Sequence, residues 1–194
     1  MNSPQKIRSF IATIPEPAVA QSLIRTGAAL IPAQAQRHLR WTAWENLHIT
    51  LRFLGDLDDR QVTQLSATLT EKLTGYHELA LSFDQICWFP SARRPRLIAA
   101  LIKPNPELHA LAIRAELAAE AIGLAPEKKP FRAHLTLARY KGGTPAPKLP
   151  ETNFSAINMA VTELVLFRSE LTRDGPIYSP LNWFPLLRSV KRKG

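Results

Sequence analysis

Two short segments, His48-Ile49-Thr50-Leu51 and His134-Leu135-Thr136-Leu137, repeat one pattern of polar and apolar residues and constrain the fold most strongly. In an extended strand, successive side chains point to opposite faces, so the histidine and the threonine of each tetrad share one face and the two aliphatic residues share the other. Burial of the aliphatic face would set the register of the strand and the direction of the polar pair. Each tetrad is therefore predicted to be a β-strand that presents an imidazole beside a hydroxyl.

The length and composition of the chain are those of a globular protein that needs neither a disulfide bond nor a structural metal to fold. A chain of 194 residues can bury a sizeable core, and Cys87 is the only cysteine, so no internal disulfide can form. The apolar run from Phe10 to Ile14 is short and ends at Pro15, which is neither a signal-peptide core nor a membrane span. We expect a cytoplasmic monomer that does not enter a membrane.

The chain is basic, with 25 lysines and arginines against 16 aspartates and glutamates and a net charge of +9. A surplus of this size favours polyanionic partners through counterion release and electrostatic steering, although it says nothing about the fold. Since many soluble proteins are equally basic without binding nucleic acid, the charge alone supports an RNA partner only weakly.

Hydrophobic periodicity and turn residues predict alternating strands and helices. Helices are expected over residues 18–35, with Gly27 as a weak point, from Asp58 or Asp59 to Leu73, and from Pro104 or Pro106 to Ile122. Strands are expected over residues 6–14, 39–42, 47–54, 78–88, 97–102, 131–140, 157–168 and 177–187. Strand ends or turns are expected at residues 55–56, 89–90, 93–96 and 174–175, and a surface loop at residues 142–150. Because each half contains a helix, a hairpin and one tetrad, we interpret the chain as an internal duplication with two facing lobes.

The side chains of the tetrads suit acid–base chemistry on a phosphoryl group. The pKa of histidine lies nearest to neutrality, so one ring can accept a proton while the other donates one. The hydroxyls of Thr50 and Thr136 can hydrogen-bond non-bridging oxygens, where charge rearranges during displacement. One His-x-Thr pair often arises by chance, but two pairs with matching apolar neighbours rarely do. Attack of water on a phosphodiester is therefore the favoured chemistry for His48 and His134.

Metal binding is the competing use of two histidines. A metal site normally recruits carboxylates or a third histidine, and neither tetrad contains one, so we expect no metal and no cofactor. His38, His77 and His109 lie outside any such pattern and are interpreted as surface or packing residues. The sequence also contains no motif for a serine or cysteine nucleophile and no phosphate-binding glycine loop.

At these residues the sequence resembles the two-histidine (2H) phosphoesterase superfamily, and most closely the bacterial RNA 2′,3′-cyclic phosphodiesterases, also called 2′-5′ RNA ligases. Beyond the tetrads, the resemblance is carried by residues 44–47, 52–55, 89–90, 94–96, 130–132 and 138–139 and by Tyr178. It implies an α+β fold with pseudo-two-fold duplication, in which two antiparallel sheets line a central cleft and the helices lie outside. One bilobal domain over residues 1–194 is expected, with tetrad 48–51 in one lobe and tetrad 134–137 in the other.

The resemblance also implies a reaction, the metal-independent hydrolysis of RNA 2′,3′-cyclic phosphate ends to 2′-phosphomonoesters, together with the reverse 2′-5′ ligation. By family analogy, His48 donates a proton to the leaving 3′-oxygen and His134 is the base that activates water. The residues alone do not separate these two roles. Thr50 and Thr136 match the phosphate-binding positions of the family, and Arg139 is a candidate for contacting the charge of the substrate.

The sequence departs from the family pattern at two positions that affect the expected substrate preference. Ala133 stands where the family usually has proline, and Ala99 stands where relatives often have tryptophan. Two further functions stay open. One is a non-catalytic module that binds phosphorylated RNA ends, and the other is a phosphodiesterase for a small cyclic nucleotide or an ADP-ribose cyclic phosphate.

Overall fold

The computed structural model describes residues 6–143, 145–150, 157–173 and 175–188. The strands are β1 (Ile7–Thr13), β2 (Leu39–Trp41), β3 (Ile49–Leu57), β4 (Leu79–Ser91), β5 (Arg94–Ile102), β6 (His134–Tyr140), β7 (Asn158–Val161), β8 (Glu163–Thr172) and β9 (Gly175–Pro185). The helices are α1 (Pro17–Ala29), α2 (Ala33–Gln36), the 3-10 helix η1 (Trp44–Asn46), α3 (Asp59–Lys72) and α4 (Pro106–Ala121). These elements confirm the predicted α+β class.

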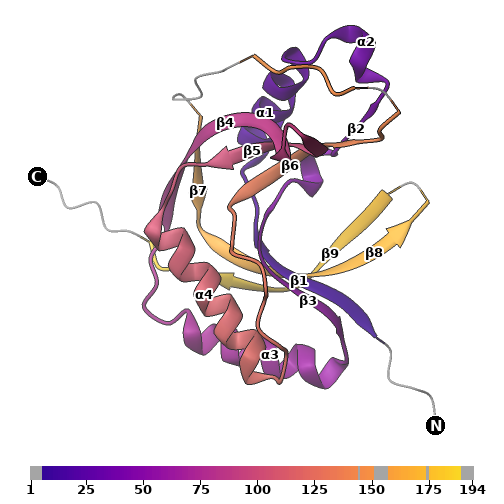
Figure 1. The fold of residues 1–194 in the computed structure, drawn as a ribbon. Helices are drawn as coiled ribbons and strands as arrows, with labels where there is room; N and C mark the ends of the chain where they lie inside the picture. Colours follow the sequence, from indigo (N-terminus) through magenta and orange to yellow (C-terminus); the bar gives the residue numbers. More distant parts are fainter. Residues whose placement is uncertain (1–5, 144, 151–156, 174, 189–194) are drawn as a thin grey trace, which may run out of the picture.

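Two antiparallel sheets form the framework (Figure 1), one with strand order β3-β1-β8-β9 and one with order β2-β6-β5-β4-β7. The first tetrad leads into β3 and the second begins β6, so each sheet carries one tetrad. The two strands contact each other although they belong to different sheets. The fold therefore brings together two segments that are far apart in the sequence.

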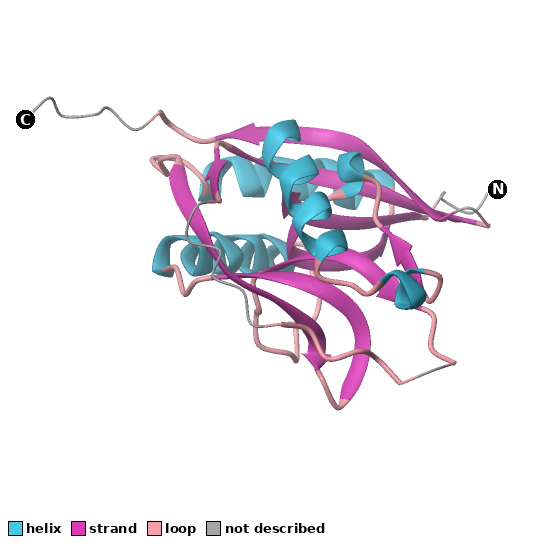
Figure 2. Cartoon of the chain, turned by 90° about the horizontal axis from the view of Figure 1, so that it is seen from above, coloured by secondary structure: helices cyan, strands magenta, loops and turns pink. Residues whose placement is uncertain are grey.

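The first sheet is apolar on both faces. Its outer face carries Ile11, Leu164 and Leu166, which belong to the main core beneath α3 and α4. These two helices lie side by side in the view from above (Figure 2). The inner face carries a second, smaller cluster, formed by Phe10, Ala12, Val165 and Phe167, with Ile14 and Tyr178 packed against it. This aromatic inner face is the support on which His48 lies.

Helix α1 packs against β5 and β6 of the second sheet. Gly27 makes this contact possible, because a Cβ at this position would lie 2.9 Å from Leu137 Cδ1 and 3.4 Å from the Trp41 ring. Gly27, the predicted weak point of the helix, is thus the position where the backbone of α1 packs against Leu137 on the apolar face of the second tetrad. A larger residue at position 27 would therefore require the Leu137 side chain to shift, so glycine is favoured there by space and not by backbone conformation.

Helix α3 begins and ends as predicted. Asp58 accepts a hydrogen bond from the Gln61 backbone, and the Gln61 side chain accepts one from the Asp58 backbone, which forms a capping box. The helix predicted over residues 18–35 is too long, since α1 ends at Ala29 and Pro32 begins a separate short helix. Proline has no amide hydrogen and fits the start of a helix better than its interior.

Two predicted strand ends are wrong because the strands continue through irregular positions. Strand β3 continues past Gly55, which has φ +72°, and a register shift against β1 absorbs the extra residue. Strand β4 continues through Phe89-Pro90, a cis peptide bond, to Ser91. Only the first four residues of β4 pair with β7, so the outer edge of β4 has no described partner strand at Pro90, a position where proline is tolerated.

The strand predicted over residues 157–168 is two strands. β7 pairs with β4 in one sheet, and β8 pairs with β1 in the other, so the chain crosses between sheets at Thr162. A β-branched, apolar run has the same appearance in either sheet, so the crossing leaves no local signal. The C-terminal hairpin of β8 and β9 is confirmed, while Asp174 of its predicted turn lies outside the described residues. Within the described segments, no helix is long and apolar enough to cross a bilayer.

Candidate active site

The alternation predicted for the two tetrads is confirmed. Ile49, Leu135 and Leu137 are completely buried and Leu51 is 6% exposed, whereas the histidines and threonines are only partly buried. His48 is the residue directly before β3, and His134 is the first residue of β6. The aliphatic residues of each tetrad anchor the strand in the core, which leaves the polar pair on the opposite face.

Both imidazoles are held by the same backbone contact. His48 Nδ1 lies 2.8 Å from the carbonyl oxygen of Asn46, and His134 Nδ1 lies 2.7 Å from that of Arg132. Since a carbonyl only accepts hydrogen bonds, Nδ1 carries the hydrogen in both rings. Nε2 of each neutral ring then carries the lone pair that can accept a proton. Each ring is fixed by the residue two positions before it in the chain.

The two rings have different aromatic neighbours. The His48 ring centroid lies 4.9 Å from that of Phe10 and 5.1 Å from that of Tyr178, which meets it edge-on. The His134 ring stacks on Phe89 at 4.3 Å with an interplanar angle of 18°, and the Arg132 guanidinium lies 4.3 Å from the same Phe89 ring. Apolar rings therefore limit the access of water to both imidazoles.

Burial lowers the proton affinity of both histidines. The pKa of His48 is lowered to about 4, mainly by desolvation and further by the charges of His134 and Arg139, while the hydrogen bond to Asn46 acts in the opposite direction. The pKa of His134 is lowered by desolvation and by the charge of Arg132, against the hydrogen bond to the Arg132 carbonyl. Because the charge of one imidazole acts on the other, the two rings belong to one electrostatic site.

Arginines surround this site. Arg139 lies near His48 and also hydrogen-bonds Tyr178, whose pKa is raised by burial and lowered in part by the charges of Arg139 and Arg8. Arg132 lies near His134. A partly buried site with this charge distribution attracts an anion such as a phosphodiester. Arg139, selected from the sequence as a substrate contact, is thus placed within electrostatic reach of the first tetrad.

The register of the second sheet explains the contact between Phe89 and His134. Phe89 lies opposite Leu97 and His134 lies opposite Leu101, so the two residues flank β5 on either side of the position of Ala99. Ala99 is completely buried. At the other departure, the Ala133 carbonyl accepts a hydrogen bond from the Ile102 backbone, so the chain joins the sheet just before the second tetrad.

Sequence reasoning assigned no role to Phe10, Phe89 or Arg132. In the sequence, Phe89 and Arg132 stand only among the residues near the tetrads that carry the family resemblance, and Phe10 stands only in a short apolar run. Phe10 and Phe89 lie on other strands than the imidazoles they contact, so the local pattern gives no signal for them. Arg132 lies two residues before His134, and alternation over the predicted strand 131–140 would have placed both on one face. His77 and His109 are exposed and His38 is partly buried, in agreement with a surface or packing role.

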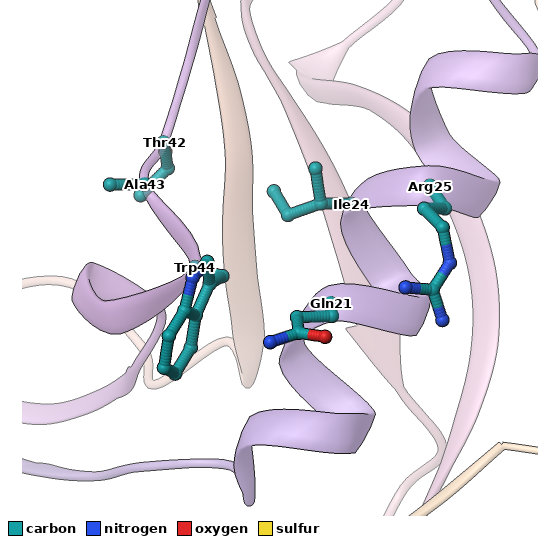
Figure 3. A pocket seen from close by; sticks show the side chains of 6 residues that line it. All are labelled: Gln21, Ile24, Arg25, Thr42, Ala43 and Trp44. Carbon is teal, nitrogen blue, oxygen red and sulfur yellow. The ribbon is translucent and has the colours of Figure 1, made fainter.

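A groove of about 440 Å³ lies between α1 and the segment that leads into the first tetrad (Figure 3). Its lining residues are Gln21, Ile24, Arg25, Thr42, Ala43 and Trp44, and they include no tetrad residue. Among the described residues, no three histidine, cysteine or carboxylate side chains are grouped as metal ligands.

Two antiparallel sheets that each present one His-x-Thr pair to a shared, cationic site are the features of a two-histidine phosphoesterase. The family model described as "LigT like Phosphoesterase" matches residues 14–99 and 102–178. The chain belongs to this family.

Curated and structural relatives support this assignment over nearly the whole chain. A protein of Methanothermobacter thermautotrophicus named RNA 2′,3′-cyclic phosphodiesterase is 31% identical over 187 residues, which cover 93% of this chain and 100% of the relative. A protein of Thermus thermophilus with the same name is 32% identical over 178 residues, covering 82% and 83% of the two chains. The crystal structure of E. coli LigT complexed with 3′-AMP superposes with a TM-score of 0.79 at 26% identity, covering 94% of this chain and 99% of that one.

Proposed function

We propose that this protein hydrolyses RNA 2′,3′-cyclic phosphate ends to 2′-phosphomonoesters by acid–base catalysis with His48 and His134. The observation that carries the proposal is the matched pair of imidazoles. Each ring donates Nδ1–H to a backbone carbonyl, and the two rings are electrostatically coupled. The names of the relatives and the net charge of +9 support RNA as the substrate.

The proposed reaction needs one proton removed and one proton supplied. His134 Nε2 takes a proton from water as the water oxygen attacks phosphorus. The bond between phosphorus and the 3′-oxygen breaks, and His48 Nε2 gives a proton to that oxygen. The products are a 2′-phosphomonoester and a free 3′-hydroxyl. Two imidazoles on opposite sides of one phosphate are suited to this exchange because each acts on one reacting oxygen.

Phosphate binding is proposed to make His48 a usable acid. With a pKa of about 4, His48 is neutral at pH 7 in the unliganded protein. A bound phosphodiester anion stabilises the imidazolium, so its pKa rises. The hydroxyls of Thr50 and Thr136 are proposed to donate hydrogen bonds to the non-bridging oxygens, and Arg139 to offset the remaining negative charge.

The reverse 2′-5′ ligation is proposed to use the same two proton transfers, with an RNA hydroxyl in place of water. One bilobal domain over residues 1–194 stays a prediction, as does the monomeric state. Neither affects the assignment of the two histidines.

Incubation of the purified protein with an RNA oligomer that ends in a 2′,3′-cyclic phosphate tests the proposal, with identification of the product isomer. We expect a 2′-phosphate as product and activity that persists with EDTA. Parallel assays with a mononucleoside cyclic phosphate and ADP-ribose cyclic phosphate identify the substrate class. Binding of the RNA end without turnover would contradict the proposal and favour a non-catalytic RNA-binding module.

The pH dependence offers a second test. The dependence of kcat/KM on pH reports the pKa values of the free enzyme, and both imidazole pKa values are lowered, so we expect a bell-shaped profile with its maximum below pH 6.5. The profile of kcat reports the complex with the anionic substrate, where the pKa of the acid is raised. The maximum of kcat should therefore lie at higher pH than that of kcat/KM.

A further inference from the structure

Arg52 is a buried charged residue within the strand that follows the first histidine. Its side chain is 8% exposed. Strict alternation from His48 and Thr50 would place Arg52 on the site face. A register shift in the pairing of β3 with β1 changes this, because Thr50 lies opposite Ala12 whereas Arg52 lies opposite Ile11. Arg52 is therefore turned away from the site and into the main core.

The guanidinium of Arg52 contacts α4 and the segment that leads to the second histidine. Nε lies 2.7 Å from Glu116 Oε2, and Nη1 lies 3.7 Å from Glu127 Oε2. Nη2 donates to the Ala125 carbonyl at 2.5 Å, and Nη1 donates to the Phe53 carbonyl at 2.6 Å. One side chain thus joins β3, α4 and residues 125–127.

Glu116 and Glu127 extend this network along the same segment. The backbone N–H of Glu127 donates to Glu116 Oε1 at 2.9 Å, and the backbone N–H of Lys129 donates to Glu127 Oε1 at 3.3 Å. Residues 124–133 have no helix or strand of their own. These side-chain contacts therefore restrain a stretch that lacks the regular backbone hydrogen bonds of an element.

The restrained segment ends at the backbone atom that orients His134. The carbonyl of Arg132 accepts the hydrogen bond from His134 Nδ1, and the Arg132 guanidinium lies over Phe89, on which the His134 ring stacks. A shift of residues 125–132 would move this carbonyl and turn the ring. Reacting groups misplaced by about 1 Å can lose roughly 100-fold in rate, so this coupling matters for catalysis.

We infer that Arg52, with Glu116 and Glu127, is a positioning residue that sets the place of His134 relative to His48. Arg52 lies on the strand that His48 leads into and binds the segment that delivers His134. The network thereby links the two halves of the site from the side opposite to the substrate. This inference rests on the proposed function, since it assigns Arg52 a role in that reaction.

The informative variant removes the network without leaving a buried charge unpaired. Arg52→Met alone leaves Glu116 without its partner and is expected to destabilise the fold. Arg52→Met combined with Glu116→Met replaces an ion pair whose arginine is buried and whose glutamate is 25% exposed, so no buried charge is left unpaired. Arg52→Lys keeps the positive charge but loses the planar guanidinium that makes several hydrogen bonds at once. If the double variant does not fold, the same measurements on Arg52→Lys test the inference. Arg168→Met, which removes an ion pair with Glu170 on a single strand, is the matched control.

The measurements are urea unfolding, kcat and KM on cyclic-phosphate RNA, and the NMR signals of both imidazoles. We expect the double variant to fold with near wild-type stability and to lose roughly 10- to 100-fold in kcat, with KM within about threefold of wild type. The Nδ1–H signal and the titration of His134 should change while those of His48 stay the same. Arg52→Lys should lie between the double variant and wild type, and Arg168→Met should equal wild type.

A stable double variant with wild-type kcat would overturn the inference, and so would a loss of kcat with unchanged His134 signals. Absence of cyclic-phosphate hydrolysis in the wild-type protein would instead refute the proposed function. In that case the NMR comparison alone decides whether Arg52 positions His134.

Discussion

The two tetrads hold their histidines alike but surround them differently. Each ring is fixed through Nδ1 by the carbonyl two residues earlier, at 2.8 Å for His48 and 2.7 Å for His134. His48 then packs against both Phe10 and Tyr178 on the first sheet, whereas His134 stacks on Phe89 with Arg132 nearby. The backbone contact is repeated, and the side-chain environment is not.

This difference separates two properties of a catalytic histidine. The repeated contact determines which ring nitrogen carries the hydrogen, because a carbonyl two residues earlier in the chain accepts it from Nδ1. The environment determines proton affinity, because desolvation and nearby charges act on the charged form. Two copies of one motif can therefore favour opposite proton transfers, which variants of each histidine and of its neighbours test.

The largest effect is expected from removal of either imidazole. His48→Ala and His134→Ala should each lower kcat on cyclic-phosphate RNA by about 10²- to 10⁴-fold, the usual contribution of a general acid or base. A substrate with an aryl leaving group, which needs no protonation, separates the roles. This substrate should restore activity to His48→Ala, which lacks the proposed acid, and not to His134→Ala, which lacks the proposed base.

His77→Ala is the control for these variants, because His77 is an exposed histidine outside the tetrads. Near-normal hydrolysis by either tetrad variant would rule out the paired mechanism. Restoration of His134→Ala instead of His48→Ala by the aryl substrate would reverse the assignment of acid and base.

The threonines should show the next largest effect. Thr50→Val and Thr136→Val keep the shape of the side chain and remove one hydroxyl, so each should lower kcat by roughly 100-fold, as for removal of one donor to a developing charge. Thr→Ser at the same positions keeps the hydroxyl and should retain most activity. Valine variants with kcat within twofold of wild type would show that the hydroxyls do not contact the phosphate in the transition state.

Protein stability should depend on pH through His48. Its pKa is about 4 in the folded protein against 6.5 for an unperturbed histidine, so the unfolded chain binds more protons between these values and stability falls as pH decreases. From pH 7 to pH 5 this contribution amounts to about 2 kcal/mol of unfolding free energy. Urea unfolding of wild type and His48→Gln at both pH values measures it.

The loss on acidification should be smaller in His48→Gln than in wild type by that amount. His77→Gln should behave as wild type. An equal loss in wild type and His48→Gln would show that His48 is more hydrated in the folded protein than its contacts indicate.

The smallest effect is expected at the aromatic contact of His134. Phe89→Ala removes the ring that stacks on His134 and admits water, so the pKa of His134 should rise toward its ordinary value. The titration of His48 is the internal control, because its aromatic neighbours are Phe10 and Tyr178. An unchanged pKa of His134 would assign its desolvation to other groups.

Local pattern predicted most of the helices and strands and the alternation of the two tetrads. The strands around both tetrads, helix α3 with its cap and the C-terminal hairpin follow from periodicity and capping residues. The predictions fail where the chain leaves regular periodicity. Pro32 divides a helix, Gly55 and Pro90 lie inside strands, and Thr162 marks a change of sheet that no local signal reports.

The repeated pattern alone was enough to select His48, Thr50, His134 and Thr136 as the side chains proposed to carry the chemistry, because any β-strand presents such a pattern on one face. Only the tertiary structure decided what surrounds them, because Phe10, Phe89 and Arg139 reach the site from other strands or through strand pairing. The position of Arg52 also depends on the tertiary structure. Strict alternation along β3 would place its side chain at the site, but the register shift against β1 turns it into the core. Alternation is a property of one strand, whereas register is a property of two, so the second cannot be obtained from a single segment.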